Sequence, residues 1–153
     1  MIVGEALNRR SDLQKRIAQL QSRLGASVLA QEGEEPPESA RELMAEADSL
    51  CEELQRLIAR INRTNAGTRL STGETVTESL ARRDVLALRQ DLLRTVVRVA
   101  TNNSLSRYSR SEIRMVRQVS IADVQQAIDA LARQRRELEA RLQAHNWTTQ
   151  LME

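Results

Sequence analysis

Aromatic residues are almost absent from this chain of 153 residues, which has one Trp, one Tyr and no Phe. Glycine and proline are also rare, with 5 and 2 residues. β-Sandwiches, barrels and α/β sheets draw on aromatic and β-branched residues and on frequent turn glycines. The composition therefore argues against these classes and favours long helices packed through Leu, Ile, Val and Ala. Because the length suits one hydrophobic core, we expect residues 1–153 to form a single helical-bundle domain.

Cysteine and histidine are scarce, which limits the chemistry open to the chain. Cys51 is the only cysteine and His145 the only histidine. An intramolecular disulfide, a Cys-rich or His-rich metal site and a paired Glu-x-x-His di-iron site are thereby excluded. A Cys51–His145 dyad stays open, although Cys51 lies on a regular amphipathic segment, which favours a structural role. We expect no metal, no cofactor and no catalytic residue, and the inventory favours a non-catalytic protein over an enzyme.

Neither sign of charge dominates, since the chain has 23 basic and 21 acidic residues and a net charge of +2. Lys15 is the only lysine, so the other basic residues are arginine. They are not gathered on one face, and we therefore expect no nucleic-acid partner. Arginine interrupts every long apolar run, and no export signal is evident, so the sequence predicts no membrane span and a cytoplasmic location.

Apolar residues recur at alternating steps of three and four in four segments, which is typical of amphipathic helices with heptad-like packing faces. The segments are separated by connections at residues 25–37, 66–76 and 102–119. The expected packing positions are Val3, Ala6, Leu13, Ile17, Leu20 and Leu24; Leu43, Ala47, Leu50, Leu54, Leu57 and Ile61; Ala81, Val85, Leu88, Leu92, Val96 and Val99; and Val124, Ile128, Leu131, Leu138, Leu142 and His145.

Polar residues mark the expected helix ends. Ser39 with Glu42 fits a capping box, Thr77 and Ser120 are the expected N-caps of the third and fourth helices, and Gly25 is the expected end of the first. The fold class is therefore all-α, with four long antiparallel helices. Two arrangements stay open: an up-down-up-down bundle, or coiled-coil hairpins completed by a partner subunit.

Two connections show the period-two alternation of β-strands. Residues 113–119 and 27–31 are candidates for a small two-stranded ribbon, and residues 67–76, with Gly73 at a turn, for a second hairpin. Arg10 and Arg135 occupy packing positions, where an unpaired charge is costly. We hypothesise that Arg10 pairs with Asp84 and Arg135 with Asp91; the alternative is that their aliphatic stems cover apolar surface while the guanidinium groups reach water.

Polar residues gather at one predicted end if the helices alternate in direction. The start of the first helix, the end of the second, the start of the third and the end of the fourth then share that end. Arginine and asparagine beside a helix N-terminus can hold an anion or a carboxylate, whereas the alternative is that these residues only cap helices. Trp147 is expected to pack on the bundle end or on a neighbouring subunit. The candidate ligand-binding residues are Arg10, Asn62, Arg63, Asn65, Arg83, Asp84, His145 and Trp147.

Short stretches across nearly the whole chain resemble the septicolysin-like family of small bacterial helical proteins. The resemblance implies a helical fold and, through the family's label, pore-forming activity. The stretches are EALNRRSDLQKRIAQL at 5–20, QEGEEP at 31–36, LIARINRTN at 57–65, LARRDVL at 80–86, RYSRSEIR at 107–114 and NWTTQL at 146–151.

The function favoured by the sequence is a non-catalytic, self-associating helical bundle that acts as a structural or protein-interaction module. The third segment carries Leu86, Leu93 and Val97 in addition to its main stripe, which is more apolar surface than one packing face needs. The partner expected from this excess is a second copy of the chain. The first alternative is a protein, or an enzyme, that binds an anion or small ligand at the Arg/Asn end, and the second is the pore-forming activity implied by the resemblance.

Overall fold

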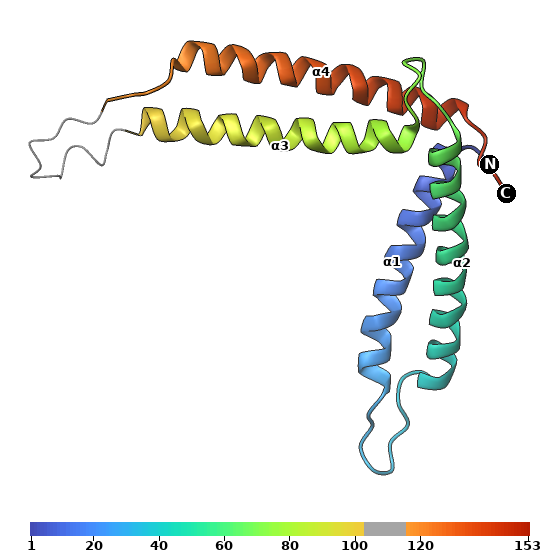
Figure 1. Cartoon of the computed structure of the whole chain (residues 1–153). Helices are drawn as coiled ribbons and strands as arrows, with labels where there is room; N and C mark the ends of the chain where they lie inside the picture. The colour runs from blue at the N-terminus through green and yellow to red at the C-terminus, as the bar shows by residue number, and fades with distance from the viewer. Residues whose placement is uncertain (103–115) are drawn as a thin grey trace, which may run out of the picture. The chain divides into compact units, whose positions relative to one another are not determined.

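The computed structural model describes residues 1–102 and 116–153 and confirms an all-α chain. Four helices follow one another: α1 (Val3–Ser27), α2 (Ala40–Gly67), α3 (Val76–Thr101) and α4 (Ile121–Thr148). They belong to two compact units. Unit 1 comprises residues 1–69 and 144–153, and unit 2 comprises residues 70–143. Each unit contains a pair of helices that run side by side in opposite directions (Figure 1).

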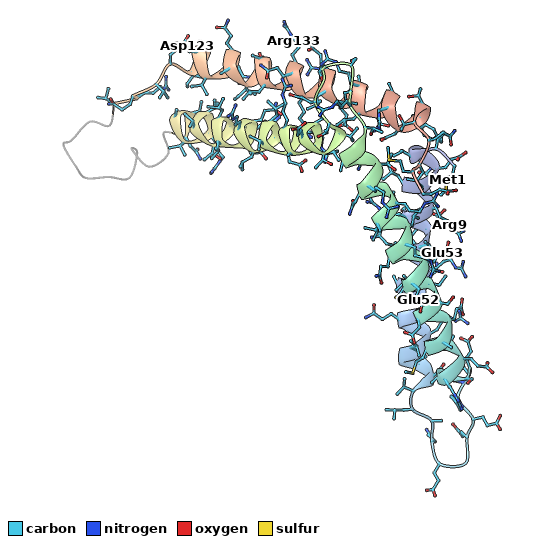
Figure 2. All side chains as sticks on the ribbon, turned by 45° about the vertical axis from the view of Figure 1, so that its right-hand side comes forward. Met1, Arg9, Glu52, Glu53, Asp123 and Arg133 are labelled. Carbon is cyan, nitrogen blue, oxygen red and sulfur yellow. The ribbon has the colours of Figure 1, made fainter. Side chains whose placement is uncertain are left out.

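The first unit is built on the α1–α2 hairpin, and its core is formed by the predicted packing positions of these helices. Charged pairs flank this core on the surface. Arg9 donates to Glu53 from Nε at 2.9 Å and from Nη2 at 2.7 Å (Figure 2), and Arg23 Nε donates to Glu38 Oε2 at 2.9 Å. The core residues are Val3, Ala6, Leu13, Leu20, Leu43, Leu50, Leu57, Ile61 and Leu151.

The last residues of the chain bind along the ends of α1 and α2 in unit 1. The amide of Val3 donates to the carbonyl of Thr149 at 2.9 Å, and the amide of Leu151 donates to the carbonyl of Met1 at 2.9 Å. The amide of Met152 donates to Oγ1 of the fully buried Thr64 at 2.9 Å. Because Leu151 also enters the core, this C-terminal segment (residues 149–153) is part of the unit's packing.

The second unit is built on α3 and the part of α4 up to residue 143. A tight turn precedes α3: the amide of Leu70 donates to the carbonyl of Glu74, and the amide of Gly73 donates to the carbonyl of Leu70, both at 2.9 Å. Gly73 has a φ of 88°, a backbone conformation that glycine adopts without steric cost. The core of this unit consists of Leu70, Val76, Leu86, Leu138 and Leu142, with Leu80 and Leu131 packed against it.

The packing face predicted for α3 is wrong. Val85, Leu88 and Leu92 are exposed, whereas Ser79, Leu86 and Gln90 are buried. The buried set recurs at steps of seven and four, which also satisfies helical periodicity. α3 has apolar residues on two faces. The face that packs on α4 contains Leu86, which was predicted to lie outside the main packing positions of this helix.

Most predicted helix ends are correct to within two residues. Ser39 accepts a hydrogen bond from the amide of Glu42 at 3.3 Å, and Ser120 accepts one from the amide of Asp123 at 3.3 Å, as expected of N-caps. Thr77 is not the N-cap of α3. Thr75 takes that place because its side chain and that of Glu78 bond each other's backbone in a reciprocal capping box. α1 also continues past Gly25 to Ser27.

The predicted β-ribbons are absent from the described part of the chain. Residues 27–31 and 116–119 form no strand, and neither do residues 67–76, which contain the tight turn before α3. The remaining ribbon residues, 113–115, lie outside the described residues. One isolated antiparallel bridge joins Ile2 to Gln150. A two-stranded hairpin is only marginally stable by itself, so a short alternating pattern in a connection does not ensure that strands form.

Candidate functional site

Within unit 1, the predicted Arg/Asn end is organised around the C-terminal segment. His145 is buried near the end of α4, where its Nδ1 lies 3.1 Å from Oγ1 of Thr149 and its Nε2 lies 3.4 Å from Oγ1 of Thr68. Burial lowers the pKa of His145 below its ordinary value, since desolvation penalises the charged imidazolium. Both ring nitrogens face threonine hydroxyls, so His145 connects the end of α4 to the end of α2.

The other predicted residues of unit 1 do not converge on one ligand position. Arg63 donates to the carbonyl of Glu153, while Asn62 is exposed on α2 and Arg10 is half-buried on α1. Oδ1 of Asn65 is buried and has no hydrogen-bond partner among the residues that the structure describes. Arg63 therefore helps to hold the C-terminal segment, a role that was not predicted from the sequence.

Trp147 contacts Gly4 while keeping 56% of its surface exposed. A Cβ atom added at Gly4 would lie 3.0 Å from Cε3 of Trp147 and 3.2 Å from the carbonyl oxygen of Asn146. The indole ring therefore lies directly on the α1 backbone, at a separation where any side chain at residue 4 would force the ring or the backbone of Asn146 to shift. The prediction that Trp147 packs on a helix end is confirmed for the part of the ring that contacts Gly4, and the rest of the ring is exposed.

The remaining predicted residues, Arg83 and Asp84, lie on α3 in unit 2 and form an ion pair with each other at 2.9 Å. The hypothesised Arg135–Asp91 pair is wrong. Asp91 bonds Arg94 of its own helix at 3.0 Å, and Arg135 Nη1 donates to Oε1 of Gln90 at 3.5 Å.

A polar groove of about 680 Å³ lies between α3 and α4, and we call it the arginine groove. Gln90 lies at its floor with 2% of its surface exposed. Arg136 has no hydrogen-bond or ion-pair partner among residues 1–102 and 116–153. Gln90 was not predicted as a groove residue, although its spacing of four residues from Leu86 places both on the same side of α3. The groove is lined by Arg83, Asp84, Gln90, Arg94, Ala132, Arg135, Arg136 and Glu139.

The largest unexpected feature of unit 2 is a row of exposed apolar side chains on α3, which we call the α3 row. It consists of Val85 (47% exposed), Leu88 (61%), Leu92 (60%), Val96 (36%) and Val99 (66%). Their spacing of 3, 4, 4 and 3 residues places them on one side of the helix. A row of this length on a surface helix is typical of a protein-interaction face.

An apolar cavity extends the α3 row at its C-terminal end. Val96 and Val99 form part of its wall together with Val116 and Val119, and its volume is about 430 Å³. Arg117 on the same segment donates from Nε to the carbonyl of Ala100 at 3.2 Å and so holds the segment at the end of α3. The apolar surface of α3 is therefore continued by residues 116–119.

Other classes of site have little support among the described residues. No three or more His, Cys, Asp or Glu side chains in that part of the chain come together as a metal site would require. Cys51 is exposed on α2, and the hydrogen-bond partners of His145 are threonines. None of the helices in the described ranges combines the length and the apolar character needed to cross a membrane.

Comparison with known proteins identifies relatives whose function is also unknown. A family of unknown function (DUF6847) matches residues 10–151. The crystal structure of a functionally unknown conserved protein from Corynebacterium diphtheriae is similar to this chain at a TM-score of 0.89 and 34% sequence identity, covering 99% of each chain. No protein of curated function matches.

These findings overturn the resemblance to septicolysin-like proteins. The family that matches nearly the whole chain carries no such name, and neither does the similar crystal structure. Three of the six stretches that suggested the resemblance, at 5–20, 57–65 and 80–86, are Arg-, Leu- and Ala-rich helix segments, a composition common to many helical proteins. The pore-forming activity that it implied has no further basis.

Proposed function

This chain belongs to the family of unknown function (DUF6847), and we propose that it is a non-catalytic helical module that associates with a second copy of itself through α3. The observation that carries this proposal is the α3 row. Five Val and Leu side chains are exposed along four turns of a helix whose other apolar face already packs on α4.

The physical basis of self-association is the burial of this row. Removing a Val or Leu side chain from water contributes about 1.5–3 kcal/mol when burial is complete, and the α3 row is only partly shielded in one copy. Heptad-like spacing lets such side chains interdigitate with those of a facing helix. A second copy supplies an identical row, so no other partner is needed.

The test is light scattering coupled to size-exclusion chromatography. We expect the unmodified chain to form a dimer or a higher oligomer at micromolar concentration, and Leu88→Glu to shift it to monomer because a carboxylate replaces a central apolar contact. The matched control is Leu29→Glu, which makes the same change at a leucine that is 85% exposed in the connection before α2. A monomeric unmodified chain, or equal effects of the two variants, would contradict the proposal.

A second candidate function is the binding of a small anion in the arginine groove. Its support is Arg136, which lines the groove beside Arg135 and has no hydrogen-bond or ion-pair partner among the described residues. Two adjacent guanidinium groups can bind phosphate or carboxylate through paired hydrogen bonds. This places the candidate ligand between α3 and α4 of unit 2, where Arg83 and Asp84 also lie.

Thermal unfolding in phosphate and in citrate, each compared with chloride at equal ionic strength, tests this second function. We expect both anions to raise the unfolding temperature of the unmodified chain. Arg136→Gln should abolish the increase, whereas Arg133→Gln, which removes an exposed arginine outside the groove, should leave it intact. Equal responses of the two variants would show that the effect is not due to the groove.

A further inference from the structure

The α3 row has a symmetric spacing that permits two ways of pairing with a second copy. Leu92 stands at its centre, with steps of four to Leu88 and Val96 and further steps of three to Val85 and Val99. In a parallel pair in register, each residue faces its own counterpart. In an antiparallel pair centred on Leu92, Val85 faces Val99 of the second copy and Leu88 faces Val96. Apolar contacts alone therefore do not choose the direction.

The charges beside the row differ on its two flanks. If Val85 and Leu88 are taken as positions a and d of a heptad, Asp84 and Asp91 occupy g positions, and Arg82 and Arg89 occupy e positions. Side chains at e and g border the contact between paired helices and set their relative direction. One flank of the row is thus acidic over two turns, and the other is basic.

A parallel pair brings opposite charges together. In this arrangement a g residue faces the e residue five positions later in the other helix, so Asp84 faces Arg89 of the second copy, and the contact occurs twice by symmetry. Asp84 is 69% exposed at its side chain. Arg89 has no hydrogen-bond or ion-pair partner in the described part of this chain, so its guanidinium is open to such a contact.

An antiparallel pair brings like charges together at its centre. There, g faces g and e faces e, so Asp91 meets Asp91 of the second copy, while Arg89 faces Val96 of the second copy, which carries no charge. The attractive contacts are two between Asp84 and Arg98, and the Asp91–Asp91 contact at the centre opposes them. Like charges that face each other between helices are destabilising and select against a pairing.

We propose that two copies of this chain associate through the α3 row in a parallel, in-register pair that the Asp84–Arg89 contacts between copies select. This inference rests on the proposed function, since it specifies the partner surface and direction of the same association. We assign a second copy as the partner of the α3 row because the acidic flank of one copy then faces the basic flank of the other. Val96, Val99 and the adjoining Val116 and Val119 extend the apolar part of the interface.

Cysteine cross-linking in a Cys51→Ser background tests the direction. Leu92→Cys should form an intermolecular disulfide in either direction, because residue 92 meets itself in both. Leu88→Cys should form one only in the parallel pair. In the antiparallel pair, the two copies of residue 88 are about 12 Å apart along the axis, beyond the Cα separation that a disulfide permits. A mixture of Leu88→Cys and Val96→Cys chains should give no preference for the mixed disulfide.

Charge exchange is the second test, and it does not depend on disulfide formation. We expect Asp84→Arg and Arg89→Asp each to weaken the dimer about tenfold, because each turns two attractive contacts into two repulsive ones. The double variant should restore dimerisation, since the exchanged charges attract again. Circular dichroism of each variant confirms that the helices are retained.

The outcomes separate this inference from the proposed function. Cross-linking of Leu92→Cys without Leu88→Cys, or a preferred Leu88–Val96 disulfide, overturns the parallel direction while self-association through α3 stands. A double charge variant as weak as the singles also overturns the Asp84–Arg89 selection. A chain that is monomeric by light scattering and gives no cross-link at residue 92 overturns the association itself.

Discussion

Gln90 on α3 and Arg135 on α4 form a polar contact in the arginine groove, at 3.5 Å between Oε1 and Nη1, beside the apolar contacts of the two helices. Leu86 lies one turn from Gln90 and Leu138 one turn from Arg135, and both leucines belong to the unit's core. A polar pair at one level of a helix seam favours the register in which the two residues meet. This contact therefore defines how α3 and α4 align within unit 2.

The Gln90 contact is expected to contribute to register more than to stability. We predict that Gln90→Leu changes the free energy of unfolding by no more than about 1 kcal/mol, because Arg135 is exposed and its guanidinium can return to water. Leu86→Ala should cost about 2–5 kcal/mol, since it leaves a cavity in the core. Urea denaturation followed by circular dichroism measures both. A loss for Gln90→Leu as large as that for Leu86→Ala would refute the interpretation.

The start of α3 gives a direct test of the capping assignment. Thr75→Ala should lower the free energy of unfolding by about 1 kcal/mol, because the hydrogen bonds of its hydroxyl with the backbone amide and the carboxylate of Glu78 are lost. Thr77→Ala, at the exposed position that the sequence suggested, should change it by less than about 0.5 kcal/mol. Urea denaturation of both variants provides the comparison, and a larger loss for Thr77→Ala would contradict the structure.

Gly4 and Gly25 on α1 form a matched pair for testing the Trp147 contact. Glycine to alanine in a helix ordinarily adds up to about 1 kcal/mol of stability. Gly25→Ala should show such a gain, because no atom lies within 4 Å of the added Cβ. Gly4→Ala should instead lower stability, since its Cβ meets the Trp147 ring and the Asn146 carbonyl. Thermal unfolding measures the shifts, and Trp fluorescence should change only in Gly4→Ala.

Stability should depend on pH through His145. Its folded-state pKa is lowered by burial, so at mildly acidic pH the unfolded chain binds more protons than the folded one. Stability is therefore complete above the ordinary histidine pKa of about 6.5 and is lost as the pH falls below it. We predict a lower unfolding temperature at about pH 5.5 than at about pH 7.5, either side of that value.

His145→Gln supplies the control for this pH dependence. Glutamine can still bond the neighbouring threonines but does not titrate, so the variant should lose less stability over the same pH range. An identical decline in both proteins would assign the pH dependence to the carboxylates. Arg23 lowers the pKa of Glu38, and that pair loses its contribution only at more acidic pH.

The candidate site was predicted less completely than the fold. The sequence predicted that Trp147 packs on a helix end, because a large ring is rarely left fully exposed. The apolar spacing of the fourth segment placed His145 at a packing position. It did not indicate that Arg63 and Thr64 bind the C-terminal segment, because those contacts join residues about 90 positions apart. No local pattern records such a pairing.

The sequence by itself determined the four helices, since apolar spacing and capping residues act over a few positions along the chain. It also determined the α1–α2 seam, where each helix has one dominant apolar face. Tertiary structure decided the packing of α3, which has two apolar faces of similar spacing. Leu86 and Gln90 became buried and Leu88 and Leu92 exposed because α4 can cover only one side of a helix. Local periodicity contains no information on which side that is.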